Sequence, residues 1–558
     1  MHHLLGAFLA LALSAAGWAQ PSPLLGILSQ ELDRNFQALK QKADPPPYFL
    51  AYAVTESEVR VLTASRGALI ADDSARDRYL DLTLRVGSPQ LDNYHRLPGE
   101  MPQFTSGARL SLDDNAAAIQ NRLWLETDRV YRLAGQRLTT LKTSTQIKAS
   151  PSDRSDDFSR EEPSVYAEKP EDLKFQAAEW VARMRKLSAA FDGFPAVLSG
   201  SITLLAQRET KWLATSEGAR IQHGHGLARL VIRAQGKAPD GMTLETTDSF
   251  EAGDAARLPK DAAIAAAVAR VAAELTGQTR ASLVEPFVGP AILSGRAAGV
   301  FFHEIFGHRI EGHRQKDEAE GQTFTQKVGQ PVLPEFLSVI FDPTRRSAEG
   351  VDLNGSYLYD DEGVKARPVT VVEQGTLKTF LMSRSPIQGF DHSNGHGRRR
   401  PGSEVVSRQS NLFVESARTV PEAKLREMLR DEIRRQGKPY GYYFKEVTGG
   451  FTTTQRRGVQ AFKVIPLVVY RVYPDGRPDD LVRGADIVGT PLASFAKILA
   501  TSDQREVFNG YCGAESGSVP VSAVSPALLV SEIEIQKKEA SRDRPPLLPS
   551  PSAAGAGR

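Results

Sequence analysis

Residues 303–308 read His-Glu-Ile-Phe-Gly-His, and this stretch decides the expected architecture of the second half of the chain. It supplies two imidazoles that can bind a metal ion, and the carboxylate of Glu304 directly follows the first. A hydrolytic zinc site needs neutral ring nitrogens as ligands and a nearby carboxylate that accepts a proton from water. The motif therefore indicates a helix that carries a metal centre, with Glu304 as candidate general base.

The spacing of the two histidines departs from the common zinc-peptidase helix, where the second His follows the first by four residues. His303 and His308 are five apart, and residues five apart on a regular α-helix diverge by about 140°. A one-residue π-bulge would bring the rings onto one face, and such bulges favour functional sites. The sequence therefore predicts a bulge or break at Phe306–Gly307.

Two other interpretations of this stretch stay open. The histidines lie in an apolar run from Val300 to Ile310, so they also fit a buried amphipathic helix with satisfied polar groups. His313 follows His308 by five residues and offers a three-histidine site instead. The stretch alone does not decide among the three.

The chain contains one cysteine, Cys512, with Gly510 and Gly513 on either side. A lone cysteine cannot form an internal disulfide, so it packs, undergoes redox chemistry or binds metal. The flanking glycines predict a tight loop over residues 509–520 rather than a core position. A thiolate with two imidazoles leaves a fourth tetrahedral position open for water, as a catalytic zinc requires.

The C-terminal half resembles the TldD/PmbA metallopeptidases through a series of ordered segments. These are His303-Glu-Ile-Phe-Gly-His-Arg-Ile-Glu-Gly312, Leu358-Tyr-Asp-Asp-Glu-Gly363, Asn394-Gly-His-Gly-Arg-Arg399, Arg408-Gln-Ser-Asn411, Val447-Thr-Gly-Gly450, Gly484-Ala-Asp-Ile-Val-Gly489, Cys512-Gly513 and Val519-Pro-Val521. The resemblance implies Zn²⁺ held by His303, His308 and Cys512, with Glu304 as general base in the hydrolysis of extended or unfolded polypeptides.

The same resemblance implies a two-domain subunit that works as a homo- or heterodimer with a TldD/PmbA-like subunit. The family includes partner subunits without the metal ligands, whereas this chain has all of them, which favours the catalytic branch. The alternative is a non-catalytic partner or scaffold that uses zinc structurally. A structural zinc site would need a fourth protein ligand, such as His313.

Composition excludes several other functions. The chain has 558 residues, too many for one compact core. Lys and Arg total 69 against 67 Asp and Glu, so no strong field recruits nucleic acid or an anionic membrane. Beyond the N-terminus no stretch reaches the roughly 18 apolar residues of a membrane span.

The two ends of the chain differ from the rest. An apolar run over 4–16, followed by Gly17-Trp-Ala19, predicts a signal peptide over residues 1–19 and an exported, periplasmic or secreted, protein. No Lys or Arg precedes the apolar run, so an uncleaved anchor is the alternative. Residues 541–558 mix Pro, Ser, Gly and Ala, as in a disordered tail.

Hydrophobic periodicity predicts an α+β fold with two domains. A mixed α/β domain is expected over 20–258, and a β-rich domain with the metal-binding helix over 259–540. Helices are expected at about 23–43, 172–191, 261–277 with Asp261 as cap, 420–436 and 490–500. Strand-like runs lie at 48–55, 58–64, 68–71, 79–86, 199–206, 211–214 and 227–234.

Three polar segments have two interpretations each. His223 and His225 form either a second metal site or a turn between strands. The basic segment 395–400 is either solvated surface or a set of arginines that contact the substrate's carbonyls or C-terminal carboxylate. The charged segment 151–163 is expected as a long surface loop rather than a domain boundary.

Overall fold

The computed structural model describes residues 22–97, 99–144, 153–456, 462–489 and 494–538, and three residues of the C-terminal tail. The expected signal peptide and nearly all of the expected disordered tail lie outside the described residues. Among the described helices, none is long and apolar enough to cross a membrane.

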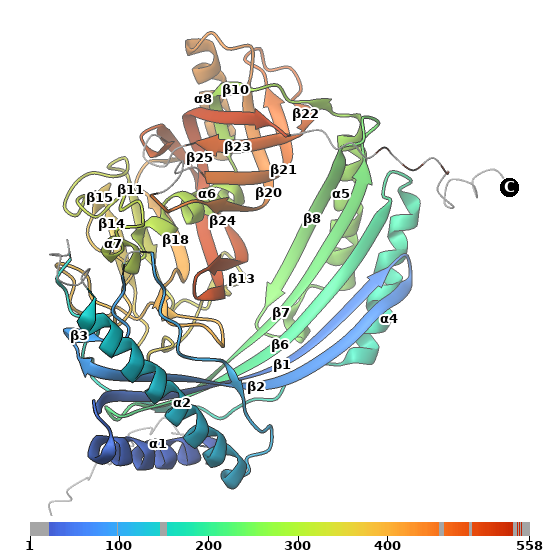
Figure 1. Ribbon diagram of the computed structural model, residues 1–558. Helices are drawn as coiled ribbons and strands as arrows, with labels where there is room; N and C mark the ends of the chain where they lie inside the picture. The colour runs from blue at the N-terminus through green and yellow to red at the C-terminus, as the bar shows by residue number, and fades with distance from the viewer. Residues whose placement is uncertain are drawn as a thin grey trace, which may run out of the picture.

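Long antiparallel strands form the N-terminal sheet (Figure 1). In sheet order its main strands are β2 (Ala68–Ser88), β1 (Pro47–Ser65), β6 (Ser199–Thr215), β7 (Arg220–Lys237) and β8 (Thr243–Ala252). Short strands at its margins are β3 (Leu91–Asp92), β4 (Ala108–Arg109) and β5 (Val165–Ala167). Pairs of short runs expected from the sequence are thus single strands, because the pairing between neighbouring strands continues without a break through the polar residues between the runs.

The two faces of this sheet have different partners. Even-numbered side chains such as Leu50, Leu204 and Leu230 pack against helices, as the two-residue period of a strand requires. The helices are α1 (Pro23–Lys42), α2 (Ala116–Thr143), α4 (Ala177–Ser188) and α5 (Asp261–Arg280), with 3-10 turns η1 (Ala189–Gly193) and η2 (Ala255–Arg257). Odd-numbered side chains such as Phe49 and Leu213 face the C-terminal domain, where Tyr359 packs against them.

Three helix predictions need correction. Helix α2 was not expected, although Asn115 caps it through the backbone N–H of Ala118 and its buried residues recur at helical spacing. Asp261 is the first residue of α5 rather than its cap, and Gly277 does not end the helix. Helix α5 packs on the N-terminal sheet, where its buried residues share one apolar core with β6, β7 and β8.

The C-terminal domain contains a 13-stranded sheet, part of which closes on itself. The closed ring consists of β10 (Phe287–Leu293), β20 (Gly441–Thr452), β21 (Phe462–Val472), β23 (Ala485–Gly489) and β25 (Gly517–Lys537). Helix α6 (Gly295–Ile305) shares one apolar core with these strands, so nearly all of its side chains are buried. The core fixes the helix that carries His303 and Glu304.

The remaining strands extend this sheet or form two small ones. They are β9 (Ser282–Leu283), β11 (Leu337–Phe341), β12 (Ser347–Ala348), β13 (Val351–Asp352), β14 (Val369–Glu373), β15 (Thr376–Leu377), β16 (Gly397–Arg398), β17 (Val406–Ser407), β18 (Asn411–Ser416), β19 (Thr419–Val420), β22 (Asp480–Arg483) and β24 (Ile498–Ala514). Helix α8 (Glu422–Arg435) matches the expected 420–436. The helix expected at 490–500 is wrong from Ile498 onward, where β24 begins, and residues 490–493 lie outside the described residues.

Candidate metal centre

The helix that carries the motif breaks where the two histidines need it to break. Helix α6 begins at Ser294, whose hydroxyl accepts the backbone N–H of Ala297 at 3.1 Å, and it ends at Ile305. Phe306 has φ −103° and ψ −54°, and the 3-10 turn η3 (Gly307–Ile310) follows. The rings of His303 and His308 therefore meet with their centroids 5.1 Å apart. A change from α to 3-10 geometry, not a π-bulge, brings them together.

Gly307 is required at this break by a close contact rather than by its backbone angles. A Cβ atom at this position would lie 1.9 Å from Oε1 of Gln409, well inside contact distance. Nε2 of Gln409 in turn donates to the backbone carbonyl of His303 at 3.3 Å. The missing side chain thus lets Gln409 pack against the turn between the two histidines.

Cys512 lies in a strand and not in the expected loop. It belongs to β24, which forms a hairpin with β25, and it pairs with Val519 in the register. The expectation from its two glycine neighbours is wrong because both glycines continue the strand, and Cys512 is buried. Its Sγ lies 3.4 Å from Nε2 of His308. One donor atom from each of His303, His308 and Cys512 lies within 4.8 Å of the others.

A buried network of charged side chains orients this donor set. Nδ1 of His308 lies 3.4 Å from Oε2 of Glu311, which leaves Nε2 directed at Cys512. Glu311 is also 3.4 Å from Nε of Arg408 and accepts a 2.9 Å bond from Nε of Arg314. Arg408 donates to the carbonyl of Cys512 at 2.5 Å. One fully buried guanidinium thus ties the turn that holds His308 to the hairpin that holds Cys512.

The charges at the cluster favour the metal-binding form of the thiol. Burial raises the pKa of Cys512, but His308, His303 and Arg408 outweigh it and hold that pKa well below its usual value. Burial lowers the pKa of His308, yet Cys512 and Glu311 raise it to about 10. The lowered pKa of Cys512 favours its thiolate, which is the form in which the sulfur binds a metal ion. Two imidazoles and a thiolate are a donor set typical of zinc.

Glu304 lies beside the cluster without belonging to it. Its Oε2 is 3.9 Å from Nε2 of His308, and the side chain is buried. Burial raises its pKa above the usual carboxyl range. Gly450 of β20 packs over it, since a Cβ there would lie 2.7 Å from Cγ of Glu304. The direction of this shift is the one expected of a buried carboxylate that accepts and returns a proton.

His313 points away from the donor set. Its Nε2 contacts Oε1 of Glu515, and Glu515 also accepts a 2.8 Å bond from Arg314. In the described part of the chain, the donor group is made of His303, His308 and Cys512 alone. The structure therefore brings together the three residues expected from the resemblance and not the three histidines.

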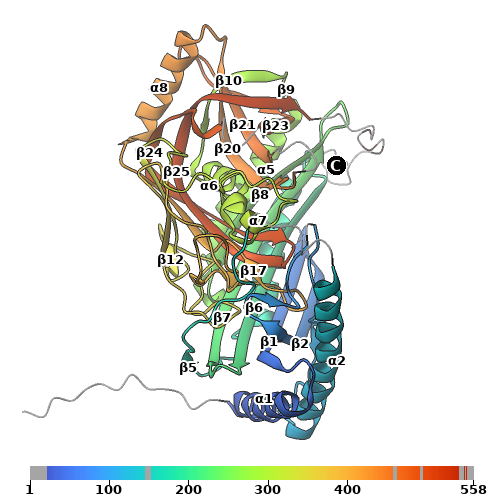
Figure 2. The same ribbon diagram turned by 60° about the vertical axis from the view of Figure 1, so that its left-hand side comes forward.

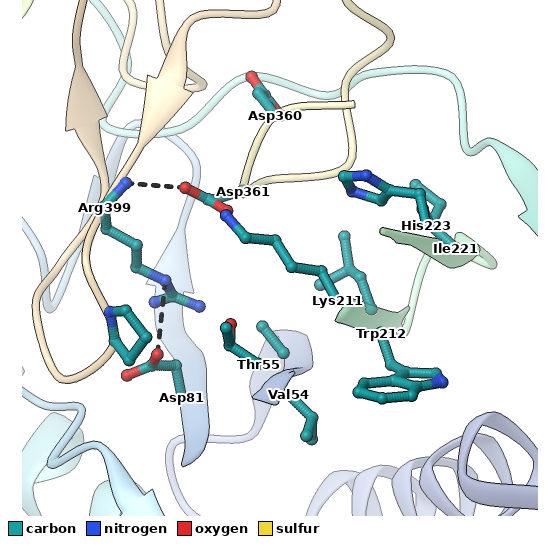
Figure 3. A pocket seen from close by; sticks show the side chains of 13 residues that line it. Val54, Thr55, Asp81, Lys211, Trp212, Ile221, His223, Asp360, Asp361 and Arg399 are labelled. Carbon is teal, nitrogen blue, oxygen red and sulfur yellow. Dashed lines mark hydrogen bonds and ion pairs between the residues drawn. The ribbon is translucent and has the colours of Figure 1, made fainter. Parts of the chain in front are cut away.

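A cavity of about 800 Å³ separates the N-terminal sheet from the C-terminal domain, and neither the three donor residues nor Glu304 are among the residues that line it. Tyr511 and Val519, neighbours of Cys512 in the hairpin, line it on one side. His223 and His225 line it from the sheet; they lie within β7, so the turn expected there is wrong. A smaller cavity of about 20 Å³ adjoins His223. There Lys211 extends to Asp361, the backbone N–H of Arg399 donates to Asp361, and the guanidinium of Arg399 lies near Asp81 (Figure 3).

Two segments expected at the surface are partly buried. Arg398 and Arg399 are only 6% and 7% exposed, because β16 and the residue after it are enclosed between the two domains. Asp157 and Phe158 of the charged segment are also buried, where Phe158 stacks against Phe49 with centroids 4.8 Å apart. Both segments join the two halves instead of facing solvent.

Comparison with known proteins finds relatives that are named metalloproteases. The family model described as the PmbA/TldA metallopeptidase C-terminal domain matches residues 288–537. A metalloprotease of Methanothermobacter thermautotrophicus is 23% identical over 471 residues, 82% of this chain and 96% of that protein. One from Methanocaldococcus jannaschii is 32% identical over 233 residues, 41% of this chain and 47% of that protein. A relative named zinc metalloprotease TldD homolog, from Saccharolobus solfataricus, is 24% identical over 248 residues, 44% of this chain and 51% of that protein.

Several of these curated relatives are matched over about half of their length. Among solved structures, TldE from Thermococcus kodakarensis superposes with a TM-score of 0.60 at 16% identity, over 90% of this chain and all of that one. That likeness concerns the fold. The second half of the chain is therefore similar to the C-terminal domain of the PmbA/TldA metallopeptidases, and the relatives that it matches are named metalloproteases.

Two residues of the site are not predicted from the sequence. Glu311 and Arg408 both lie in segments that carry the family resemblance, next to the motif and in Arg408-Gln-Ser-Asn411. A charged residue in such a segment is the signal that could have singled them out. Their pairing with each other, almost a hundred residues apart, could come only from the fold.

Proposed function

We propose that this chain is a zinc-dependent peptidase that hydrolyses peptide bonds of extended or unfolded polypeptides, with Glu304 as general base. The observation that carries the proposal is the convergence of His303, His308 and Cys512 beside the buried carboxylate of Glu304. These three residues would hold the ion. Bound there, zinc would supply a Lewis acid that polarises a peptide carbonyl and acidifies water.

The protein's own residues then divide the remaining work. Glu304, with its raised pKa, accepts a proton from the attacking water and returns it to the leaving amine. Glu311 holds His308 through Nδ1 and so keeps Nε2 toward the open side of the cluster. Gly450 closes over Glu304 and limits the water that can reach it.

The strand next to Glu304 supports an extended substrate. Beyond Phe444, β20 continues to Thr452 and pairs with β21 on one side. Among the described strands none pairs with its other side over residues 446–452, because β10 ends at Leu293, the partner of Phe444. A peptide could add to this edge through backbone hydrogen bonds, with little demand on side-chain identity.

The proposal includes assembly and location. A homo- or heterodimer with a TldD/PmbA-like subunit is supported by the fold shared with TldE. Export, with removal of residues 1–19, is supported by the apolar N-terminal run. A scaffold that uses zinc structurally is the competing function, and the three-donor group favours the catalytic one because it leaves a coordination position free.

One pair of variants tests the proposal. Glu304→Gln keeps the shape and the ligands, so zinc content should stay at the wild-type level while peptidase activity falls by about 10²–10⁴-fold. Cys512→Ala should lose zinc, as measured by metal analysis after dialysis. Equal activity of wild type and Glu304→Gln against a peptide library would leave the scaffold function instead. Retained zinc in Cys512→Ala would reduce Cys512 to a packing residue.

A further inference from the structure

Arg398 is a buried cation without an ionic partner at the edge of the large cavity. Its guanidinium lines the cavity although the residue is 94% buried. Its ring neighbour is Tyr357, with the guanidinium 4.8 Å from the ring centroid. Nη1 donates to the carbonyl of Gln409 at 2.6 Å. In the described part of the chain no carboxylate lies within ion-pair distance of it.

The other buried or half-buried cations around this cavity have ionic partners. Lys211 pairs with Asp361 at 2.7 Å, and Arg399 lies 3.8 Å from Asp81. On the N-terminal side Arg208 pairs with Glu171 at 3.7 Å. A buried unpaired guanidinium is costly, and burial lowers the pKa of Arg398 for this reason. A protein keeps such a group where a ligand completes the pair.

Arg398 is also connected to the metal centre. Gln409, whose carbonyl Arg398 binds, donates through its side chain to the carbonyl of His303. The positive charge of Arg398 interacts electrostatically with Cys512. Tyr511 and Val519, the neighbours of Cys512 in the hairpin, line the same cavity as Arg398. A group held by Arg398 would therefore lie close to the peptide bond presented to the cluster.

We propose that Arg398 binds a carboxylate of the peptide substrate, either its C-terminal carboxylate or that of an acidic side chain, in this cavity. The planar fork of a guanidinium matches a carboxylate through two parallel hydrogen bonds, and only one of its nitrogens is occupied by Gln409. The inference deepens the proposed function and rests on it. It predicts that cleavage occurs a short distance from a carboxylate rather than anywhere along the chain.

Binding to an inactive form tests this without turnover. Three fluorescent peptides of one sequence are compared on zinc-loaded Glu304→Gln: one with a free C-terminus, one amidated, and one amidated with a Glu near its end. The free acid or the Glu peptide should bind about 10–100-fold more tightly than the plain amide, as a charge-assisted pair does. The peptide that binds more tightly identifies the source of the carboxylate. Equal binding of all three would overturn the inference.

Variants of Arg398 assign the effect to this residue. Adding Arg398→Gln should remove the preference and bring all three peptides to the affinity of the amide. Arg398→Lys, which keeps the charge without the fork, should restore part of it. Arg346→Gln is the matched control, because it removes an exposed cation from the rim of the same cavity and should leave the preference intact. An equal loss of preference with Arg346→Gln would mean general attraction and contradict a specific site.

Turnover separates this inference from the proposed function. If the wild-type zinc protein cleaves all three peptides (free acid, amide, and amide with Glu) at equal rates and positions, the peptidase stands and the carboxylate site is wrong. If it cleaves neither, yet Arg398 still determines which peptide binds, the carboxylate site stands and the peptidase is wrong. Far-ultraviolet circular dichroism of each variant establishes that it is folded; if Arg398→Gln is not, the comparison of the three peptides on the parent decides.

Discussion

Gly307 shows how one absent side chain sets the geometry of the candidate site. Gly307→Ala places a Cβ where Oε1 of Gln409 now lies, so Gln409 or the turn must shift. Because the turn carries His308, we expect zinc affinity to fall by about 10–100-fold, the range for loss of residues that orient ligands. Competition with a chelator of known affinity measures it.

Gly135→Ala is the control for this substitution. Gly135 lies inside α2, and nothing is within 4 Å of a Cβ there. This change should raise the unfolding free energy by about 0.5–1 kcal/mol, since alanine is the better helix former, and leave zinc affinity alone. Unchanged zinc affinity in Gly307→Ala would show that the Gln409 contact does not position His308.

Glu311 and Arg408 allow a second prediction about the residues behind the ligands. Glu311→Gln removes the charge that holds His308 and pairs with Arg408, while it keeps the shape. We expect zinc affinity to drop about 10–100-fold. Lower affinity with unchanged activity of the fully zinc-loaded variant would identify Glu311 as a positioning residue. An activity loss at full zinc loading, as in Glu304→Gln, would contradict that role.

Sequence alone could identify the donor residues but not what holds them. His303, Glu304 and His308 follow from a local motif, and Cys512 is the only thiol in the chain, so few alternatives existed. The break at Phe306–Gly307 also follows from spacing, although its 3-10 form does not. The link from Glu311 to Arg408 depends on how two distant segments pack, which no local pattern records.

At the scale of elements, the expected and observed structures differ where single residues count for more than the periodicity of the apolar side chains. Helix α2 has a regular apolar stripe at Ile119, Leu123, Val130 and Leu138, so its sequence contained the signal. The glycines beside Cys512 predict a loop where the structure has a hairpin. Glycine is disfavoured in strands only by a weak preference, which cross-strand pairing with β25 overrides.

Strand β7 carries a buried histidine that makes stability depend on pH. Burial, with a smaller contribution from Lys211, lowers the pKa of His223 to about 3 in the folded protein. Unfolded histidine has a pKa near 6.5, so between about pH 6.5 and 3 the unfolded chain binds the additional proton. The contribution of His223 to the free energy of unfolding is fully present above about pH 6.5. It falls by about 1.4 kcal/mol for each pH unit below that value.

His223→Gln should flatten this part of the profile. The measurement is the urea midpoint of wild type and variant between pH 7 and 4.5. The change of the midpoint with pH is compared, because the loss of packing on Tyr359 shifts the midpoint of the variant by the same amount at every pH. His392→Gln, at an exposed histidine, is the control and should follow wild type. Parallel profiles for His223→Gln and wild type would mean that His223 is not kept neutral in the fold.

At the scale of the whole molecule, the long sheet and the ring of strands face each other across the cavity (Figures 1 and 2). The sequence predicts two domains but not this arrangement, because the segments that join them have the polar composition of solvent-exposed loops. Their charges are buried on folding: Lys211 reaches Asp361, and Arg384 reaches Glu217 and Ser159. Charged residues at a domain interface cannot be told from solvated ones by composition.

Arg384 gives the test of how strongly the halves are coupled. It is 2% exposed, pairs with Glu217 at 2.8 Å, donates to the carbonyl of Ser159 at 2.6 Å, and lies over the ring of Phe158 at 4.0 Å. Arg384→Ala leaves these partners without their cation. Removing one member of a buried pair costs about 3–5 kcal/mol, and the partial exposure of Glu217 reduces this to about 2–4 kcal/mol.

The exposed pair of Arg257 with Asp352 crosses the same interface and provides the matched control. Its ion pair is also 2.8 Å long, but the side chain of Arg257 is 64% exposed, so Arg257→Ala should cost about 0–1 kcal/mol. Calorimetry should show the melting transition of Arg384→Ala lowered and broadened toward two steps, because the N-terminal half loses its anchor first. A similar small shift for both variants would mean that shape, and not the buried cation, holds the halves around the cavity.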